Sequence, residues 1–97
     1  MPIWNGNSSQ GATLIIQYGC GSCHEIAGIP GAYGLVGPSL DNFGRRIYIA
    51  GMLRNSPDNL MRWLENPRAI VPGNVMPNMH ISRVDARDIA AYLLNLK

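Results

Sequence analysis

Cys20-Gly21-Ser22-Cys23-His24 is the most informative stretch of this 97-residue chain. Its two thiols stand three positions apart and an imidazole follows at once, so one short segment of backbone presents three strong ligand groups. These are the only two cysteines in the sequence. The chain therefore cannot be a disulfide scaffold unless the two pair with each other. The spacing points to another use for both thiols.

The chemistry that best matches this motif is covalent attachment of a haem. Two thiols can add across the two vinyl groups of the porphyrin, and the adjacent His24 is then placed beside the iron as its proximal ligand. Three other interpretations stay open. A thioredoxin-like redox pair needs a preceding strand in a βαβ context. A structural zinc site needs four ligands, which Cys20, Cys23, His24 and His80 could supply only awkwardly. The pattern can also arise by chance.

Length and composition fit a single small domain that needs help to form a core. A chain of this size buries only about 60–65% of the surface that it exposes when unfolded. Hydrophobic residues make up 46% of the sequence but aromatic residues only 7%, and there are 11 Gly and 7 Pro. A large flat cofactor would supply the missing core. The formal net charge is +2 with scattered arginines, which does not indicate a nucleic-acid-binding stripe. No apolar run approaches the roughly 18 residues of a membrane helix.

Cap residues and apolar spacing predict two helices in the first two thirds of the chain. The first runs from about Ser9 to Gly19, with Ser8 or Ser9 as its N-cap, and it brings the cysteine motif to its C-terminal end. Ser56-Pro57 is a strong start for the second helix, because Ser caps well and Pro suits the first helical position. This helix should end at Asn66-Pro67.

A further helix is predicted at the end of the chain, where Ser82 and Asp85 resemble a capping box. Its apolar face consists of Ala86, Ile89, Ala90, Leu93 and Leu96, with Asp85, Arg87 and Asp88 outside that face. Residues 26–44 and 67–81 are rich in Gly and Pro and should form irregular loops. Residues 46–49 are the only candidate strand. The predicted fold class is all-α, with about three to five helices.

Four motifs occur in an order that resembles the class I cytochromes c. They are Tyr18-Gly19-Cys20-Gly21-Ser22-Cys23-His24, Gly37-Pro38-Ser39-Leu40, Met76-Pro77-Asn78-Met79 and Asp88-Ile89-Ala90-Ala91-Tyr92-Leu93. The match spans roughly residues 9–96 and is most similar to single-haem domains of bacterial respiratory chains, some of which are fused to oxidase subunits. The resemblance implies a small cytochrome c fold wrapped around one covalently bound haem c, attached through Cys20 and Cys23.

A second ligand to the iron is expected from the methionine-rich loop, because thioether sulfur opposite imidazole is the usual pair in cytochromes c. Met76 and Met79 lie in this loop, just before the last helix. Pro77 restricts the backbone of Met76 to an extended form, which gives a rigid loop that can present a sulfur inward. We predict Met76 as the ligand, with Met79, His80 or no sixth ligand as the alternatives.

The resemblance also implies roles for residues around the haem. Pro38 would accept a hydrogen bond from the His24 imidazole through its carbonyl, and Arg46, Tyr48 and Trp63 would donate to the haem propionates. The plain alternatives are a loop proline, a solvated Arg46 and an ordinary core Trp63. In the family the first helix crosses the last at a small residue, for which Gly11 and Ala12 are both candidates.

These observations predict a one-electron carrier that turns over no substrate. The alternative is a haem domain with an open or displaceable sixth ligand, acting as a peroxidase or a gas-binding module. Expected partners are a redox-protein donor and acceptor, such as a respiratory complex or a terminal oxidase, at the periplasmic or outer face of the cytoplasmic membrane. We expect residues 1–7 to be a leader and residues 8–97 to be the cytochrome c domain, excised from a larger protein. Docking should use a small apolar patch around the exposed haem edge. Loop residues such as Ile26, Ile29, Val75 and Met79 could supply it, with packing against the haem as the plain alternative.

Overall fold

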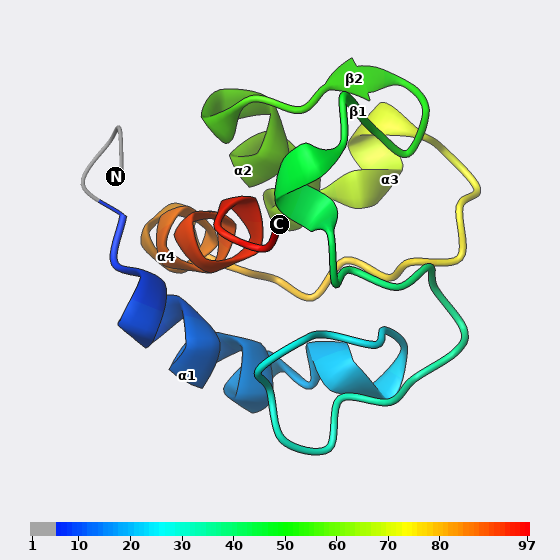
Figure 1. The fold of residues 1–97 in the computed structure, drawn as a ribbon. Coiled ribbons are helices and arrows are strands. Elements are labelled where there is room, and N and C mark those ends of the chain that lie inside the picture. The colour runs from blue at the N-terminus through cyan, green and yellow to red at the C-terminus, as the bar shows by residue number, and fades with distance from the viewer. Residues whose placement is uncertain (1–5) are drawn as a thin grey trace.

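A computed structural model describes residues 6–97 of the chain. Within this range the fold is built from α-helices joined by long loops, as Figure 1 shows. The α-helices are α1 (Ser8–Tyr18), α2 (Pro57–Glu65), α3 (Pro67–Ile70) and α4 (Arg83–Leu94). Two 3₁₀ turns, η1 (Cys20–Ser22) and η2 (Phe43–Arg45), and an antiparallel hairpin of β1 (Tyr48–Ile49) and β2 (Leu53–Arg54) complete the elements. The all-α prediction is confirmed, and the one candidate strand contributes to the small hairpin.

Helix α1 is capped one residue earlier than predicted. The N-cap is Asn7, not Ser8 or Ser9, and its Oδ1 accepts a hydrogen bond of 3.0 Å from the amide of Gln10. The backbone amide of Asn7 also donates to Asp88 Oδ1 of α4, at 2.9 Å. Asn7 is therefore joined to the domain by both its side chain and its backbone. Residues 1–5 of the predicted leader lie outside the described residues.

The other predicted caps are confirmed, and one helix was missed. Ser56 accepts from the amide of Asn59 at the start of α2, and Ser82 accepts from the amide of Asp85 at the start of α4. The prediction that residues 67–81 are irregular was wrong at its beginning, where α3 forms. Asn66-Pro67 ends α2 but also starts α3, because the Asn66 side chain accepts from the third residue on and Pro suits the first helical position.

Helices α1 and α4 cross in contact, and the crossing residue is Gly11 rather than Ala12. A Cβ atom on Gly11 would collide with the backbone carbonyl of Asp88. Figure 1 shows α1, in blue, running beneath α4, in orange. The prediction that Asp88 lies outside the packed face was wrong, since its exposed fraction is only 7%. The cost of burying this carboxylate is offset, because it accepts a hydrogen bond from the Asn7 amide and lies 3.6 Å from Arg87 Nε.

The core lies between α1, α2 and α4. Ile15, Leu60 and Ile89, one from each helix, are among its most deeply buried side chains. Besides this core packing, an exposed ion pair connects α4 to α2, with Arg83 Nη1 2.9 Å from Glu65 Oε1. No helix within residues 6–97 combines the length and the apolar character that crossing a membrane requires.

Replacing Gly11 with Ala should destabilise the protein by about 1–3 kcal/mol, because the added methyl group forces apart two helices that touch through their backbones. Denaturant unfolding of the purified protein measures this loss. Gln17→Ala, on the exposed side of the same helix, is the matched control and should change stability by less than about 0.5 kcal/mol. Equal stability of Gly11→Ala and the parent protein would contradict the close crossing.

Candidate functional site

A cavity of about 330 Å³ opens beside the core, and the sequence motifs line it. This volume is within the range of small-molecule sites. Most of its wall is apolar. Helices α1, α2 and α4 contribute side chains that include Ile15, Leu60, Leu64, Ile89 and Leu93, and most of the other lining residues belong to loops and turns. A more open hollow of about 390 Å³ lies beside Glu25 and Asp41 but contains neither cysteine. The first cavity is therefore the candidate site.

The cysteine motif enters the cavity through a tight turn. Gly19 ends α1 in a left-handed conformation with φ of 75°, and η1 follows at once. The Cys20 carbonyl then accepts from the amides of both Cys23 and His24, which folds the motif back on itself. As a result, all three side chains line the same cavity. One short segment thus supplies two thiols and an imidazole to a single wall.

The environment of the thiols distinguishes among the alternatives left open by the sequence. Both cysteines are free, and burial raises the pKa of the Cys20 thiol. Redox-active thiols have lowered pKa values instead, so this shift disfavours a thioredoxin-like pair. Within residues 6–97, no three or more His, Cys, Asp or Glu side chains come together in a way that could hold a metal ion. A zinc site that combines the motif with His80 is therefore not formed.

His24 is oriented by the loop that follows the motif. Its Nδ1 lies 2.8 Å from the carbonyl oxygen of Pro38. Because a carbonyl can only accept, the proton of the neutral ring is on Nδ1, which leaves Nε2 with a free lone pair. A backbone carbonyl behind a metal-binding histidine is the usual way in which the ring is held for a metal. The arrangement therefore presents Nε2 as a donor atom.

Gly37 allows this loop to approach the imidazole. A Cβ atom at position 37 would overlap the His24 ring, and the Gly37 amide donates to the Cys23 carbonyl at 2.7 Å. The backbone therefore passes directly against the ring, where any larger residue would displace it. In the sequence Gly37 is visible only as part of a motif, because its close approach to the imidazole depends on tertiary structure.

The two methionines of the loop between α3 and α4 are placed differently. Both line the cavity, but Met79 also packs against the hydrophobic core. Met76 is partly buried. His80, the other predicted alternative, is exposed and has a left-handed backbone with φ of 57°. The structure thus brings two thioether sulfurs into the lining of the site.

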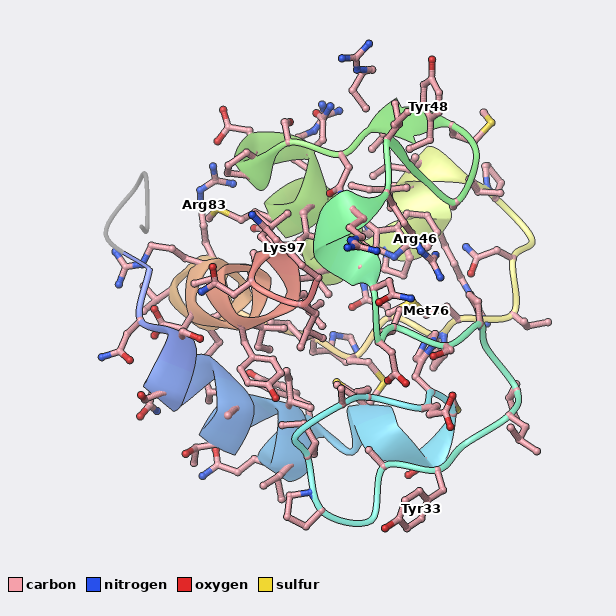
Figure 2. The ribbon with its side chains drawn as sticks, viewed as in Figure 1. Tyr33, Arg46, Tyr48, Met76, Arg83 and Lys97 are labelled. Atoms are coloured by element: carbon pink, nitrogen blue, oxygen red, sulfur yellow. The ribbon has the colours of Figure 1, made fainter. Side chains whose placement is uncertain are left out.

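Three residues were expected to donate to the haem propionates, and the structure brings two of them to the cavity. Arg46 and Trp63 line it, and Arg46 Nη2 donates to the Ser39 carbonyl at 2.6 Å. Tyr48 does not line it: its side chain points outward at the edge of the molecule in Figure 2. The reason is strand alternation, since Ile49 is 2% exposed and faces the core, so its neighbour must face solvent.

One lining residue that sequence reasoning missed is Asn74, whose side chain bonds to the backbone on both sides of it. Asparagine after Pro and Gly is typical of turns, so the sequence contains no signal that would separate it from an ordinary turn residue.

The residues present fit a haem. Two thiols and an imidazole occupy one wall, thioether sulfurs are available in another segment of the lining, and most of the remaining wall is apolar. Arg46 supplies a cation to the same cavity, where acidic groups of a ligand could pair with it. Because residue 37 is a glycine, it places no side-chain atom against the His24 imidazole. A group with apolar faces, two thiol-reactive positions and carboxylates matches this donor set.

Comparisons with known proteins agree with this chemistry. The family model described as Cytochrome c matches residues 8–97. Subunit 2 of cytochrome c oxidase from Alkalihalophilus pseudofirmus is 37% identical over 91 residues, which cover 93% of this chain and 26% of that protein. The corresponding subunit from Bacillus sp. PS3 is 32% identical, with coverage of 99% and 28%. The chain thus spans about a quarter of the length of these curated relatives.

Among solved structures, SoxXA from P. pantotrophus has a similar fold, with a TM-score of 0.75. The match covers 95% of this chain and 82% of the SoxXA chain, at 20% sequence identity. At this identity the likeness concerns the fold alone.

Gly37→Ala should reduce the yield of haem-loaded protein several-fold, because the new methyl group overlaps the His24 ring and costs about 1–3 kcal/mol of packing. The ratio of haem absorbance to total protein measures it. Gly31→Ala is the matched control, since a Cβ there meets nothing within 4 Å and only the left-handed backbone is strained. It should lower stability while leaving the haem spectrum unchanged. Full loading of Gly37→Ala would show that the ring tolerates the added atom.

Proposed function

Because this chain belongs to the cytochrome c family, we propose that it is a one-electron carrier domain of a bacterial respiratory chain. The family binds haem c covalently, and Cys20 and Cys23 are the two attachment points. When bound, the haem supplies an iron that alternates between the ferrous and ferric states. The observation that carries the proposal is a single apolar cavity lined by both thiols, the His24 imidazole and Met76.

We assign His24 Nε2 and the Met76 sulfur as the two protein ligands to the iron. The bond from His24 to the Pro38 carbonyl holds the ring in the tautomer that leaves Nε2 free. Met76 is the preferred sulfur because Met79 already contributes to the packed core. Two protein ligands would leave the iron no free position for a substrate. This favours electron transfer over the peroxidase or gas-binding alternative.

Arg46 and Trp63 are proposed to meet the haem propionates. Both line the cavity, and a guanidinium or an indole N–H stabilises a partly buried carboxylate by hydrogen bonding. The Arg46 guanidinium lies 5.5 Å from the centre of the Phe43 ring and is also bonded to the Ser39 carbonyl, so its position is supported from two sides. Tyr48 is not included in this role because its side chain faces away from the cavity.

The domain exchanges electrons with other redox proteins, and we propose a respiratory complex or a terminal oxidase as the partner. Three curated relatives are oxidase subunits about four times as long as the matched segment, which favours a domain that works within a larger oxidase subunit. We propose the periplasmic or outer face of the cytoplasmic membrane as its location, since haem c is normally attached on that side. Degradation of the haem-containing band by protease added to spheroplasts tests this placement, and full protection would contradict it.

The surface proposed for docking differs from the patch that the sequence predicted. Ile26 and Ile29 are buried in the core, so the prediction that they form the patch was wrong. The large exposed hydrophobic residues at the cavity are Val36 and Val75, with exposed fractions of 72% and 80%, and Leu35 at 88% is adjacent to Val36. The formal charge of +2 is offset by two ionised propionates, so long-range steering should be weak.

The choice of Met76 is tested with a pair of alanine variants. The ferric protein should show the weak absorption near the red end of the visible spectrum that thioether ligation gives. Met76→Ala should abolish this band and let the ferrous iron bind carbon monoxide. Met79→Ala should keep the band and instead lower stability by about 2 kcal/mol, through lost packing. The opposite pattern would assign the ligand to Met79, and carbon monoxide binding by the unaltered protein would favour the open-site alternative.

The docking surface is tested through the rate of electron transfer to a terminal oxidase. Between low and physiological salt the rate should change less than about threefold, because a near-neutral domain gains little from steering. Leu35→Asp should slow the transfer, while Val84→Asp, at an exposed apolar residue on α4, is the matched control and should leave it unchanged. A tenfold fall with salt would instead reveal a charged docking face.

A further inference from the structure

The segment that leads to Met76 is fixed by a turn. In Val71-Pro72-Gly73-Asn74 the amide of Asn74 donates to the Val71 carbonyl at 3.2 Å, and Gly73 has a φ of 84°. Proline at the second position and a left-handed glycine at the third are the signature of a type II turn. The turn brings the Asn74 side chain into the cavity lining. The chain then reaches Met76 only two residues later.

The Asn74 side chain joins the two ends of this segment. Its Nδ2 donates to the Val71 carbonyl at 2.8 Å, and its Oδ1 accepts from the Met76 amide at 2.7 Å. Both partners have a fixed character, since a carbonyl only accepts and an amide N–H only donates, so they determine which end of the side-chain amide faces each of them. An aspartate at this position could not satisfy both contacts, because an ionised carboxylate only accepts hydrogen bonds. A shorter side chain such as serine could not reach both partners at once. Both bonds are partly buried, which strengthens them relative to bonds in water.

The backbone of Met76 is thereby restrained on both sides. Its amide is held by Asn74, and on its carbonyl side Pro77 limits it to an extended conformation. The exposed Val75 lies between two residues that line the cavity and are themselves partly buried. We infer that Asn74 is a positioning residue that holds the Met76 sulfur available to the iron and slows its exchange for other ligands. This inference rests on the proposed role of Met76 as a ligand.

Asn78 provides a matched comparison within the same loop. Its Oδ1 accepts from the amide of His80 at 2.8 Å, which is the same side-chain-to-backbone bond two residues on. Asn78 is not among the residues that line the cavity, and its bond lies beyond Pro77 and holds an exposed residue. If the variants only loosened the loop in general, replacing either asparagine would have the same effect. A loss of Met76 positioning would follow only from Asn74.

The test measures imidazole binding to the ferric haem-loaded protein, since imidazole must displace Met76. Asn74→Ala removes both hydrogen bonds and should raise the imidazole affinity about tenfold, which corresponds to about 1.4 kcal/mol. It should also weaken the red absorption band. Asn78→Ala should change the affinity less than about twofold. Asn74→Ser, which keeps an oxygen able to accept from the Met76 amide, should fall between the parent and Asn74→Ala.

The outcomes separate this inference from the proposed function. If Met76→Ala abolishes the red band but Asn74→Ala leaves the band and the imidazole affinity unchanged, the positioning role is wrong and the ligand assignment stands. If Met76→Ala keeps the band, the ligand assignment fails and the inference fails with it. Equal effects of Asn74→Ala and Asn78→Ala would also overturn it, because they would show general loosening of the loop. Should Asn74→Ala not load with haem, the same comparison is made with Asn74→Ser.

Discussion

The backbone contact between α1 and α4 is the constraint on which the rest of the structure depends. At Gly11 the two helices touch without an intervening side chain, and the carbonyl of Asp88 occupies the space that a Cβ atom would need. A chain this small has few large side chains with which to fix one helix against another. The crossing fixes the direction of α1, and hence the place at which Cys20 enters the cavity. The Asn7 amide reinforces it through its bond to Asp88.

The site is assembled from three loops that approach the cavity separately. One carries the cysteine motif, the second brings the Pro38 carbonyl to His24, and the third carries Met76. Loops are suited to this task because they can follow the outline of a bound group more closely than a helix can. They also need internal restraint, which backbone contacts and asparagine side chains supply here. Two examples of such restraint are the close contact of Gly37 with the imidazole and the two hydrogen bonds of the Asn74 side chain.

The cavity also explains how a domain with so little aromatic content forms a core. Ile15, Leu60 and Ile89 are almost completely buried from solvent, yet they also line the cavity wall. A haem bound there would cover these side chains from the other side and extend the core by contact with its apolar faces. Ligand binding and folding stability are therefore linked in this protein, since a group that binds only the folded state stabilises it.

The sequence by itself determined the family, the all-α fold, the attachment cysteines and the start sites of α2 and α4. Each motif and each cap behind these predictions consists of residues close together in the chain, such as Ser56-Pro57, whose effect is local. Tertiary structure alone decided which way Tyr48 faces, that Asp88 is buried, and that Gly11 rather than Ala12 lies at the crossing. Each of these depends on which distant segment packs against the residue. Composition and spacing describe one segment at a time, so they do not contain that information.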